Sequence, residues 1–326
     1  MQTRKLGYSN LHLTPIGLGT WAIGGGNNPY GWGTQDDNDS IATIRHALDL
    51  GINWIDTAAG YGKGHSEEIV GQAIAGRRHE VIIATKCGIL WKADGSNIYG
   101  HLQAESIRQE VENSLRRLKV EVIDLYQIHW PLPNEDIEIG WETVADLVKA
   151  GKVRYGGVSN FSVAQLKRIQ PIHPVASLQP PYSMLVREVE TELLPYCAAN
   201  DIGVVVYSPM QAGLLTGKMT RERVATFPDN DWRQRSPFFQ EPQLSIYLEL
   251  VEKLRPIAEY NGWSLPQLAI AWVLRRPEIT AAIVGARRPE QVDEFIGTRQ
   301  WNLSSEDIAK IEAILVNSAV ESIATP

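Results

Sequence analysis

Short runs of aliphatic and β-branched residues recur along the chain, and each run stops at a polar or small residue. Short apolar runs of this kind are typical of strands that are buried on both faces of a parallel sheet. From residue 14 onward, strands are expected in eight places: 14–19, 51–56, 81–86, 123–129, 153–158, 175–178, 204–207 and 281–284.

Between these runs, apolar residues recur at helical spacing. In residues 104–118, Ile107 and Val111 share one face with further apolar residues, while charged residues fill the opposite face. That pattern is typical of a helix that covers a sheet. We expect Ser66 to act as an N-cap, because two acidic residues follow it in the first turn. Helices are expected over residues 39–50, 66–75, 104–118, 141–150, 162–170, 188–200, 243–261, 264–275 and 304–316.

Alternating strands and helices predict an α/β fold with a parallel sheet, and eight such units predict a closed (β/α)8 TIM barrel. A doubly wound open sheet is the alternative, because strand order cannot be read from the pattern. However, no Gly-x-Gly-x-x-Gly follows the first strand and opens a helix. Gly24-Gly-Gly26 precedes a polar stretch instead, so the fingerprint of the open dinucleotide-binding fold is missing.

Three segments lie outside the repeating units. Residues 1–13 alternate weakly around a turn-rich tetrapeptide that begins at Gly7, which predicts a β-hairpin closing the barrel end opposite the active site. Residues 22–38 and 208–242 are too long for plain turns. Because long loops in compact domains are usually functional, we expect both to lie over the site at the C-terminal strand ends.

Composition narrows the class of protein. The chain has 326 residues, of which 44% are hydrophobic and 21% charged, as in ordinary soluble proteins. Without a linker-like stretch, we expect one domain over 1–326 with a mobile tail at 317–326. The net charge of −7 argues against nucleic acid as a partner. No apolar run approaches the roughly 20 residues that cross a bilayer, and the start lacks the apolar core of a signal peptide. A cytoplasmic protein without a membrane partner is expected. Its two cysteines form neither a metal pattern nor a disulfide scaffold.

Four residues that could carry chemistry follow three successive predicted strands: Asp56 and Tyr61, then Lys86, then His129. The C-terminal ends of parallel strands meet at one edge, where such folds keep their active sites. An ammonium beside Tyr61 would lower the pKa of the phenol from about 10. Asp56 would be the counter-ion of a buried Lys86, and His129 could bind a carbonyl oxygen.

This set of residues can protonate an oxygen as a carbonyl becomes an alcohol. It contains neither a nucleophile nor a metal cage, so reduction needs a hydride from a nicotinamide or flavin cofactor. Each residue also has an ordinary explanation, as a rim tyrosine, a lysine that reaches water, a core histidine or a capping aspartate. Their occurrence together at three consecutive strand ends favours catalysis, with Tyr61 as the general acid.

The same stretches resemble the aldo-keto reductase family, from about Gly7 to about Leu315. The resemblance implies a TIM barrel, NADPH as cofactor, a small carbonyl substrate and the same four catalytic roles. The surroundings of Gly285 are closer to bacterial members and potassium-channel β-subunits than to the aldose reductase type. Five segments carry the resemblance, namely Gly51–Gly62 around the tyrosine, Thr85-Lys86, Gln127-Ile-His129, Gly156–Asn160 and Ile283–Gln291.

The residues themselves suggest how a cofactor is held. Ser159 and Gln179 end strands and could bind a carboxamide, with helix capping as the alternative; Tyr207 could lie on a nicotinamide ring, or pack under the long loop. Arg287 precedes a helix that Pro289 can open, and a helix start with arginines suits a 2′-phosphate. The alternative for these arginines is a solvated surface.

The resemblance extends this to a full cofactor set. The sequence departs from some family members at Phe295, where an asparagine is common, so the adenine contact at this position does not carry over from the family. The cofactor residues that it implies are Gly19, Thr20, Trp21, Asp56, Ser159, Asn160, Gln179, Tyr207, Ser208, Pro209, Gly213, Leu215, Gly217, Lys218, Gly285, Arg287, Gln291 and Glu294. The substrate pocket is expected to be walled by Trp21, Tyr61, Trp91, His129 and Trp130, with Trp232 from the long loop.

Three functions remain after this reasoning. The first is an NADPH-dependent aldehyde or ketone reductase, which the family predicts to be monomeric. The second is an NADPH-binding regulatory subunit that senses redox state and turns over slowly. The third is a non-redox barrel enzyme such as an isomerase, which leaves the segments of Arg287 and Tyr207 unexplained.

Overall fold

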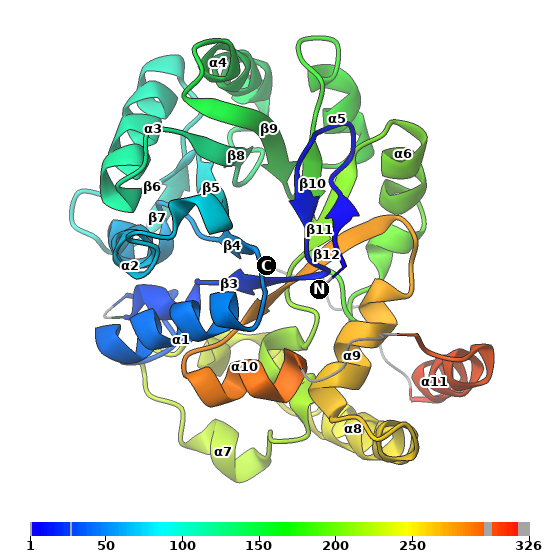
Figure 1. Cartoon of the computed structure of the whole chain (residues 1–326). Helices are drawn as coiled ribbons and strands as arrows, with labels where there is room; N and C mark the ends of the chain where they lie inside the picture. The colour runs from blue at the N-terminus through cyan, green and yellow to red at the C-terminus, as the bar shows by residue number, and fades with distance from the viewer. Residues whose placement is uncertain (1, 27, 297–301, 319–326) are drawn as a thin grey trace.

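The computed structural model describes residues 2–26, 28–296 and 302–318. Eight parallel strands close into a barrel in the order β10-β11-β12-β3-β4-β5-β8-β9 (Figure 1). The predicted TIM barrel is therefore confirmed, and an open sheet is excluded because β12 pairs with β3. The barrel strands are β3 (Ile16–Gly19), β4 (Trp54–Asp56), β5 (Ile82–Cys87), β8 (Ile123–Ile128), β9 (Val153–Ser159), β10 (Ser177–Gln179), β11 (Gly203–Val206) and β12 (Ile279–Gly285).

Helices form a ring around this barrel (Figure 1). The α3 helix has the predicted bounds, whereas α4 begins earlier than predicted, at Ile137. The helices are α1 (Asp37–Asp49), α2 (His65–Ala73), α3 (Ala104–Leu118), α4 (Ile137–Lys149), α5 (Val163–Ile169), α6 (Leu193–Ala199), α7 (Arg221–Ala225), α8 (Gln243–Tyr260), α9 (Leu265–Leu274), α10 (Pro289–Ile296) and α11 (Ser305–Asn317). No helix in the described ranges is long and apolar enough to span a membrane. Of the expected tail, residues 319–326 lie outside the described part of the chain.

The prediction that Ser66 caps α2 is wrong. The helix begins at His65, and its N-cap is Gly64, whose φ of 96° is left-handed. A tight turn over Tyr61–Gly64 precedes the helix, which therefore starts one residue earlier than predicted. The buried Ser66 hydroxyl is thereby free to donate to the Thr20 carbonyl oxygen at 2.9 Å. Ser66 thus ties α2 to the residue that follows β3.

The N-terminal hairpin closes one end of the barrel, as predicted. Its strands β1 (Arg4–Lys5) and β2 (His12–Leu13) pair antiparallel, and its leucines pack against the inward-facing Trp54 and Val205. Gly7 adopts a φ of 49° and lies so close to β11 that a Cβ there would be 2.5 Å from the Gly203 nitrogen. Only glycine fits this contact, so the hairpin is pressed tightly onto the barrel.

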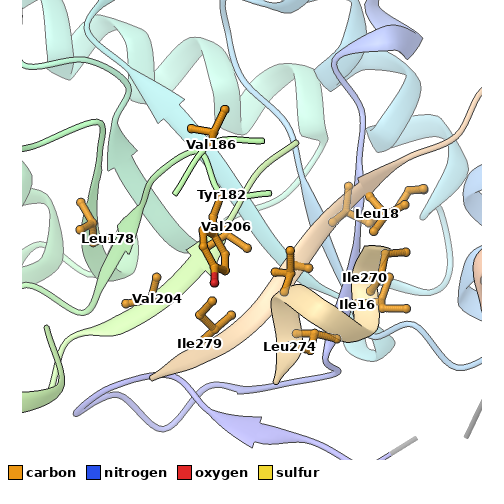
Figure 2. Packing of buried hydrophobic residues seen from close by; sticks show 14 of the residues in the cluster. Ile16, Leu18, Leu178, Tyr182, Val186, Val204, Val206, Ile270, Leu274 and Ile279 are labelled. Carbon is orange, nitrogen blue, oxygen red and sulfur yellow. The ribbon is translucent and has the colours of Figure 1, made fainter. Parts of the chain in front are cut away.

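The largest hydrophobic core lies between the barrel and the helix ring. Figure 2 shows Leu18 of β3 and Ile279 of β12 beside Ile270 and Leu274 of α9. Every residue of α9 is buried, because neighbouring helices α8 and α10 cover the side that faces away from the barrel. A fully buried aliphatic side chain contributes about 1.5–3 kcal/mol, so this layer stabilises the frame that positions the strand ends.

Two elements lie in segments where no regular structure was predicted. A second hairpin, β6 (Ile89–Trp91) and β7 (Ile98–Gly100), extends from the end of β5. The short helix α7 lies within the long 208–242 loop. Both follow the C-terminal end of a barrel strand, so both belong to the face where the predicted catalytic residues lie.

Candidate active site

The two long loops that follow β3 and β11 contact each other. Trp32 forms an antiparallel bridge with Asp231, and the Trp232 amide donates to the Gly31 carbonyl oxygen at 3.0 Å. The Asn230 side chain adds a bond to the Gly26 carbonyl oxygen at 2.7 Å. The mouth of the barrel is therefore bordered by a joined pair of loops rather than by two independent ones.

A buried ion pair lies beneath this mouth. The Lys86 Nζ is 2.6 Å from Asp56 Oδ1, and less than 4% of either side chain is exposed. Lys86 also donates to the Thr57 carbonyl oxygen, and the Gln179 amide donates to the other Asp56 oxygen at 2.8 Å. Burial acts to lower the pKa of Lys86, but Asp56 and Tyr61 outweigh it and raise that pKa. The lysine is therefore charged at neutral pH.

Tyr61 completes a triad with this pair. Its hydroxyl is 3.2 Å from Lys86 Nζ. The next residue, Gly62, has a φ of 57°, and a Cβ there would collide with the Gly24 carbonyl oxygen. The turn that aims Tyr61 at Lys86 therefore requires glycine.

The expected direction of the Tyr61 pKa shift is wrong. Burial raises the pKa of Tyr61, and Lys86, which lowers it as expected, does not fully offset this effect. Asp56 adds to the rise because its negative charge opposes a phenolate. Tyr61 therefore holds its proton at neutral pH, which is the state that a proton donor requires.

His129 lies beside the tyrosine. Its ring is perpendicular to that of Tyr61, with the centroids 5.7 Å apart, and its backbone N–H donates to the Cys87 carbonyl oxygen. Burial, with a smaller effect of the Lys86 charge, holds the pKa of His129 well below its usual value of 6.5. A neutral imidazole keeps one N–H, with which it can donate to a substrate oxygen.

This lowered pKa predicts a pH dependence of stability. Below pH 6.5 the unfolded chain binds a proton at His129 that the folded protein does not bind, so stability falls as pH decreases. We expect wild type to lose up to about 1.4 kcal/mol more than His129→Gln between pH 7 and pH 5.5. Urea unfolding at both pH values measures this difference. Equal losses in the two proteins would contradict a buried, neutral His129.

A row of hydrogen-bonded polar groups continues from the histidine. The Asn160 amide donates to the His129 carbonyl oxygen at 3.0 Å, and its oxygen accepts from the Tyr207 hydroxyl at 2.9 Å. Ser159 donates to the Gln179 carbonyl oxygen at 2.8 Å. Helix capping, the alternative role considered for Ser159, is instead the role of nearby Ser162, which forms a capping box at the start of α5. The structure thus brings together the four polar residues expected at the nicotinamide.

The loop after β11 begins with an unusual backbone. Ser208 and Ala212 have φ values of 57° and 51°, and Gly213 has a φ of 97°. Leu215 of the same segment is buried. Further along, Lys218 forms an ion pair with Glu294 of α10. The two residues expected at the phosphates and the adenine are therefore bonded to each other.

Arg287 lies where β12 ends, just before α10. Its guanidinium donates to Gln35 Oε1 at 2.6 Å, to the Trp32 carbonyl oxygen at 3.0 Å and to the Thr34 carbonyl oxygen. The Gln291 side chain accepts the Arg287 backbone N–H at 2.7 Å. Arg287 is thus at the expected helix start, but its side chain extends to the first loop.

Aromatic rings line the site between the loops. Trp21 is stacked on Tyr61 and on Trp232, with centroid distances of 6.2 and 5.2 Å, and Trp32 meets Trp21 edge-on. Trp91 comes from the unpredicted β6–β7 hairpin and donates to the Gly60 carbonyl oxygen at 3.0 Å. Trp32 was not among the residues predicted to line the pocket, although an aromatic residue in a long Gly-rich loop is a usable signal.

Comparison with known proteins agrees with this geometry. The model of the Aldo/keto reductase family matches residues 15–316. The chain belongs to the aldo/keto reductase family. It is therefore an oxidoreductase, and the predicted resemblance is confirmed, including its closeness to bacterial members.

Individual relatives cover nearly the whole aldo/keto reductase chain. "Aldo-keto reductase YhdN" of Bacillus subtilis is 44% identical, over 98% of this chain and 95% of its own. The "NADH-specific methylglyoxal reductase" of Escherichia coli is 39% identical, over 94% and 96%. Among solved structures, the glycerol dehydrogenase AKR11B4 from Gluconobacter oxydans superimposes with a TM-score of 0.89 at 39% identity, covering 100% of this chain and 98% of that one.

Proposed function

We propose that this aldo/keto reductase is a cytoplasmic, monomeric, single-domain enzyme that uses NADPH to reduce aldehydes or ketones to alcohols. The observation that carries the proposal is the Tyr61 hydroxyl, a proton-bearing phenol within 3.2 Å of a buried, charged Lys86. Two free, buried cysteines are consistent with a reducing compartment.

The described residues fit a nicotinamide dinucleotide phosphate. Arg287 is half-buried, and the acceptors of its guanidinium are neutral oxygens of Trp32, Thr34 and Gln35. Within the described ranges, no carboxylate lies within ion-pair distance of it. A half-buried guanidinium that forms no ion pair can be stabilised by a bound anion, and a phosphate would supply that charge. Arg287 and Arg288 would hold the 2′-phosphate, and Ser159, Asn160 and Gln179 the carboxamide under the Tyr207 ring.

The coenzyme would supply the hydride for the carbonyl carbon. The protein supplies the rest of the reaction. His129 donates a hydrogen bond to the carbonyl oxygen and orients it beside Tyr61, which delivers its proton to that oxygen. Lys86 then stabilises the resulting phenolate, and Asp56 keeps Lys86 charged in a dry site. In the oxidative direction, Tyr61 accepts the proton.

NADPH is expected to be preferred over NADH. One charge-assisted contact at the 2′-phosphate contributes roughly 1.5–3 kcal/mol, so the KM for NADPH should be at least about tenfold lower. Steady-state assays with both coenzymes and one aldehyde measure this ratio. Equal values, or a preference for NADH like that named for the Escherichia coli relative, would contradict the proposed role of the arginines.

Wild type should be assayed with NADPH and a panel of aldehydes and ketones. This panel should include small oxygenated substrates, because two relatives are named for activity on methylglyoxal and glycerol. Rapid NADPH oxidation with any member of the panel supports the reductase proposal. Tight NADPH binding without turnover on the whole panel would favour the slow regulatory subunit instead. Absence of NADPH binding would contradict the proposed coenzyme, and binding of NADH in its place would retain the reductase proposal with that coenzyme.

A further inference from the structure

Arg287 joins the first loop to the start of α10. Arg287 donates three hydrogen bonds to the segment 32–35. The Gln35 amide returns a bond to the Arg287 carbonyl oxygen at 2.9 Å. Gln35 therefore contacts Arg287 both at its guanidinium and at its backbone.

The same segment reaches the catalytic tyrosine through aromatic contacts. The Trp32 carbonyl oxygen accepts from Arg287, and the Trp32 ring meets Trp21 edge-on at 5.3 Å. Trp21 in turn is stacked on Tyr61. One continuous path of contacts thus joins the start of α10, where a coenzyme phosphate is proposed, to the aromatic wall above the proton donor.

The neighbouring Arg233 differs from Arg287 in its charge balance. Its Nε and Nη2 groups donate to the two oxygens of Asp231, at 3.0 and 2.6 Å, and the Phe227 and Trp32 rings lie over its guanidinium. Arg233 is therefore neutralised where it lies. Arg287 lines the same cavity, of ≈ 230 Å³, and forms no ion pair among the described residues, although the Asp231 carboxylate also acts on its charge.

A guanidinium has five N–H donors, of which the first loop takes three from Arg287. The first loop leaves two donors unused, and Arg287 lines the cavity, where an anion could bind. Burial lowers the pKa of Arg287, and the charge of Arg233 lowers it further, while Asp231 partly offsets both effects. An anion that binds here would hold the side chain in the position that anchors the loop.

Building on the proposed function, we propose that Arg287 is a positioning residue that couples coenzyme binding to substrate binding. It holds the segment 32–35, and through Trp32 the wall formed by Trp21, against the site of Tyr61. A 2′-phosphate on Arg287 would strengthen this anchor, so NADPH would improve carbonyl binding more than NADH does. The role of Arg287 is then not confined to recognising the phosphate.

Two variants separate the anchoring of the segment 32–35 from recognition of the phosphate. Arg287→Lys keeps the charge but loses the planar fork that reaches three acceptors. Gln35→Ala removes both bonds of Gln35 to Arg287 without changing any charge at the coenzyme. The matched control is His46→Ala, which removes the exposed His46–Asp293 pair joining α1 to α10 outside the segment 32–35.

We expect both anchor variants to raise the KM for the carbonyl about tenfold, with kcat within about threefold of wild type. Only Arg287→Lys should also raise the KM for NADPH. In wild type, the carbonyl KM should be lower with NADPH than with NADH, and Gln35→Ala should reduce that difference. His46→Ala should leave all these constants unchanged. A change confined to the coenzyme KM in both variants would overturn the proposal.

Hydrogen exchange of the peptide 30–36 gives a readout that does not depend on turnover. Exchange should be faster in Arg287→Lys and Gln35→Ala than in wild type and His46→Ala, and NADPH should slow it in wild type more than NADH does. Unchanged exchange in both anchor variants would overturn the anchoring role. If wild type reduces no carbonyl but still shows these exchange effects, the reductase proposal fails while the anchor stands.

Discussion

Replacing Tyr61 with phenylalanine is expected to lower kcat for carbonyl reduction about a thousandfold. The variant keeps the ring that is stacked on Trp21 and removes only the hydroxyl that is hydrogen-bonded to Lys86. A positioned general acid typically contributes about 10²–10⁴-fold, and a site shielded from water offers little replacement for the lost proton. Saturating NADPH with the best aldehyde of the panel gives the kcat of both proteins.

Two controls make this result specific. NADPH binding, followed by fluorescence, should be nearly unchanged in Tyr61→Phe because the hydroxyl contacts Lys86 rather than the expected coenzyme residues. Tyr155→Phe removes a hydroxyl at the opposite end of the barrel, where it accepts from the Asn10 backbone N–H. This variant should keep full activity. A kcat for Tyr61→Phe within about threefold of wild type would exclude Tyr61 as the proton donor.

Replacing Lys86 with methionine is expected to destroy activity and to destabilise the fold at the same time. The substitution leaves the Asp56 carboxylate buried without its cation, since the two side chains are less than 4% exposed. Removing one partner of a buried pair costs about 3–5 kcal/mol of folding free energy. It also removes the charge that stabilises the Tyr61 phenolate. Urea unfolding and kcat/KM measure the two effects separately.

The double variant Asp56→Asn, Lys86→Met further distinguishes the loss of activity from the loss of stability. A neutral asparagine can still accept from Gln179, so most of the lost stability should return. Activity should not return, because no ammonium remains beside Tyr61. If the double variant recovers activity together with stability, the charge of Lys86 is not needed for catalysis, and the single variant was inactive only through its fold.

The strands and the meeting of Asp56, Tyr61, Lys86 and His129 at one end of the barrel could be predicted, because each depends on local signals. The run that ends in Asp56, the run that ends in Lys86 and the run that ends before His129 are all short and β-branched. Parallel strands place such ends at one edge whatever their order, and the structure shows that these ends do meet, through the pair Lys86–Asp56.

Other features depend on contacts between distant residues, and sequence patterns do not carry that information. Nothing around Arg287 indicates that its side chain reaches Gln35, since the two are 252 residues apart. The net pKa of Tyr61 likewise depends on how far burial outweighs one lysine, which is a property of packing. The Ser66 prediction failed for a local reason: the left-handed Gly64 already provides the helix start.

The closure of the barrel has a consequence for how the chain is made. The first barrel strand, β3, pairs with the last, β12, with Ile16 opposite Ala282. On the ribosome, synthesis at about 5–20 residues per second separates the emergence of these strands by on the order of tens of seconds. During that time β3 offers an open edge that can pair with other chains. A nascent chain of this protein therefore needs shielding until its last strand leaves the ribosome.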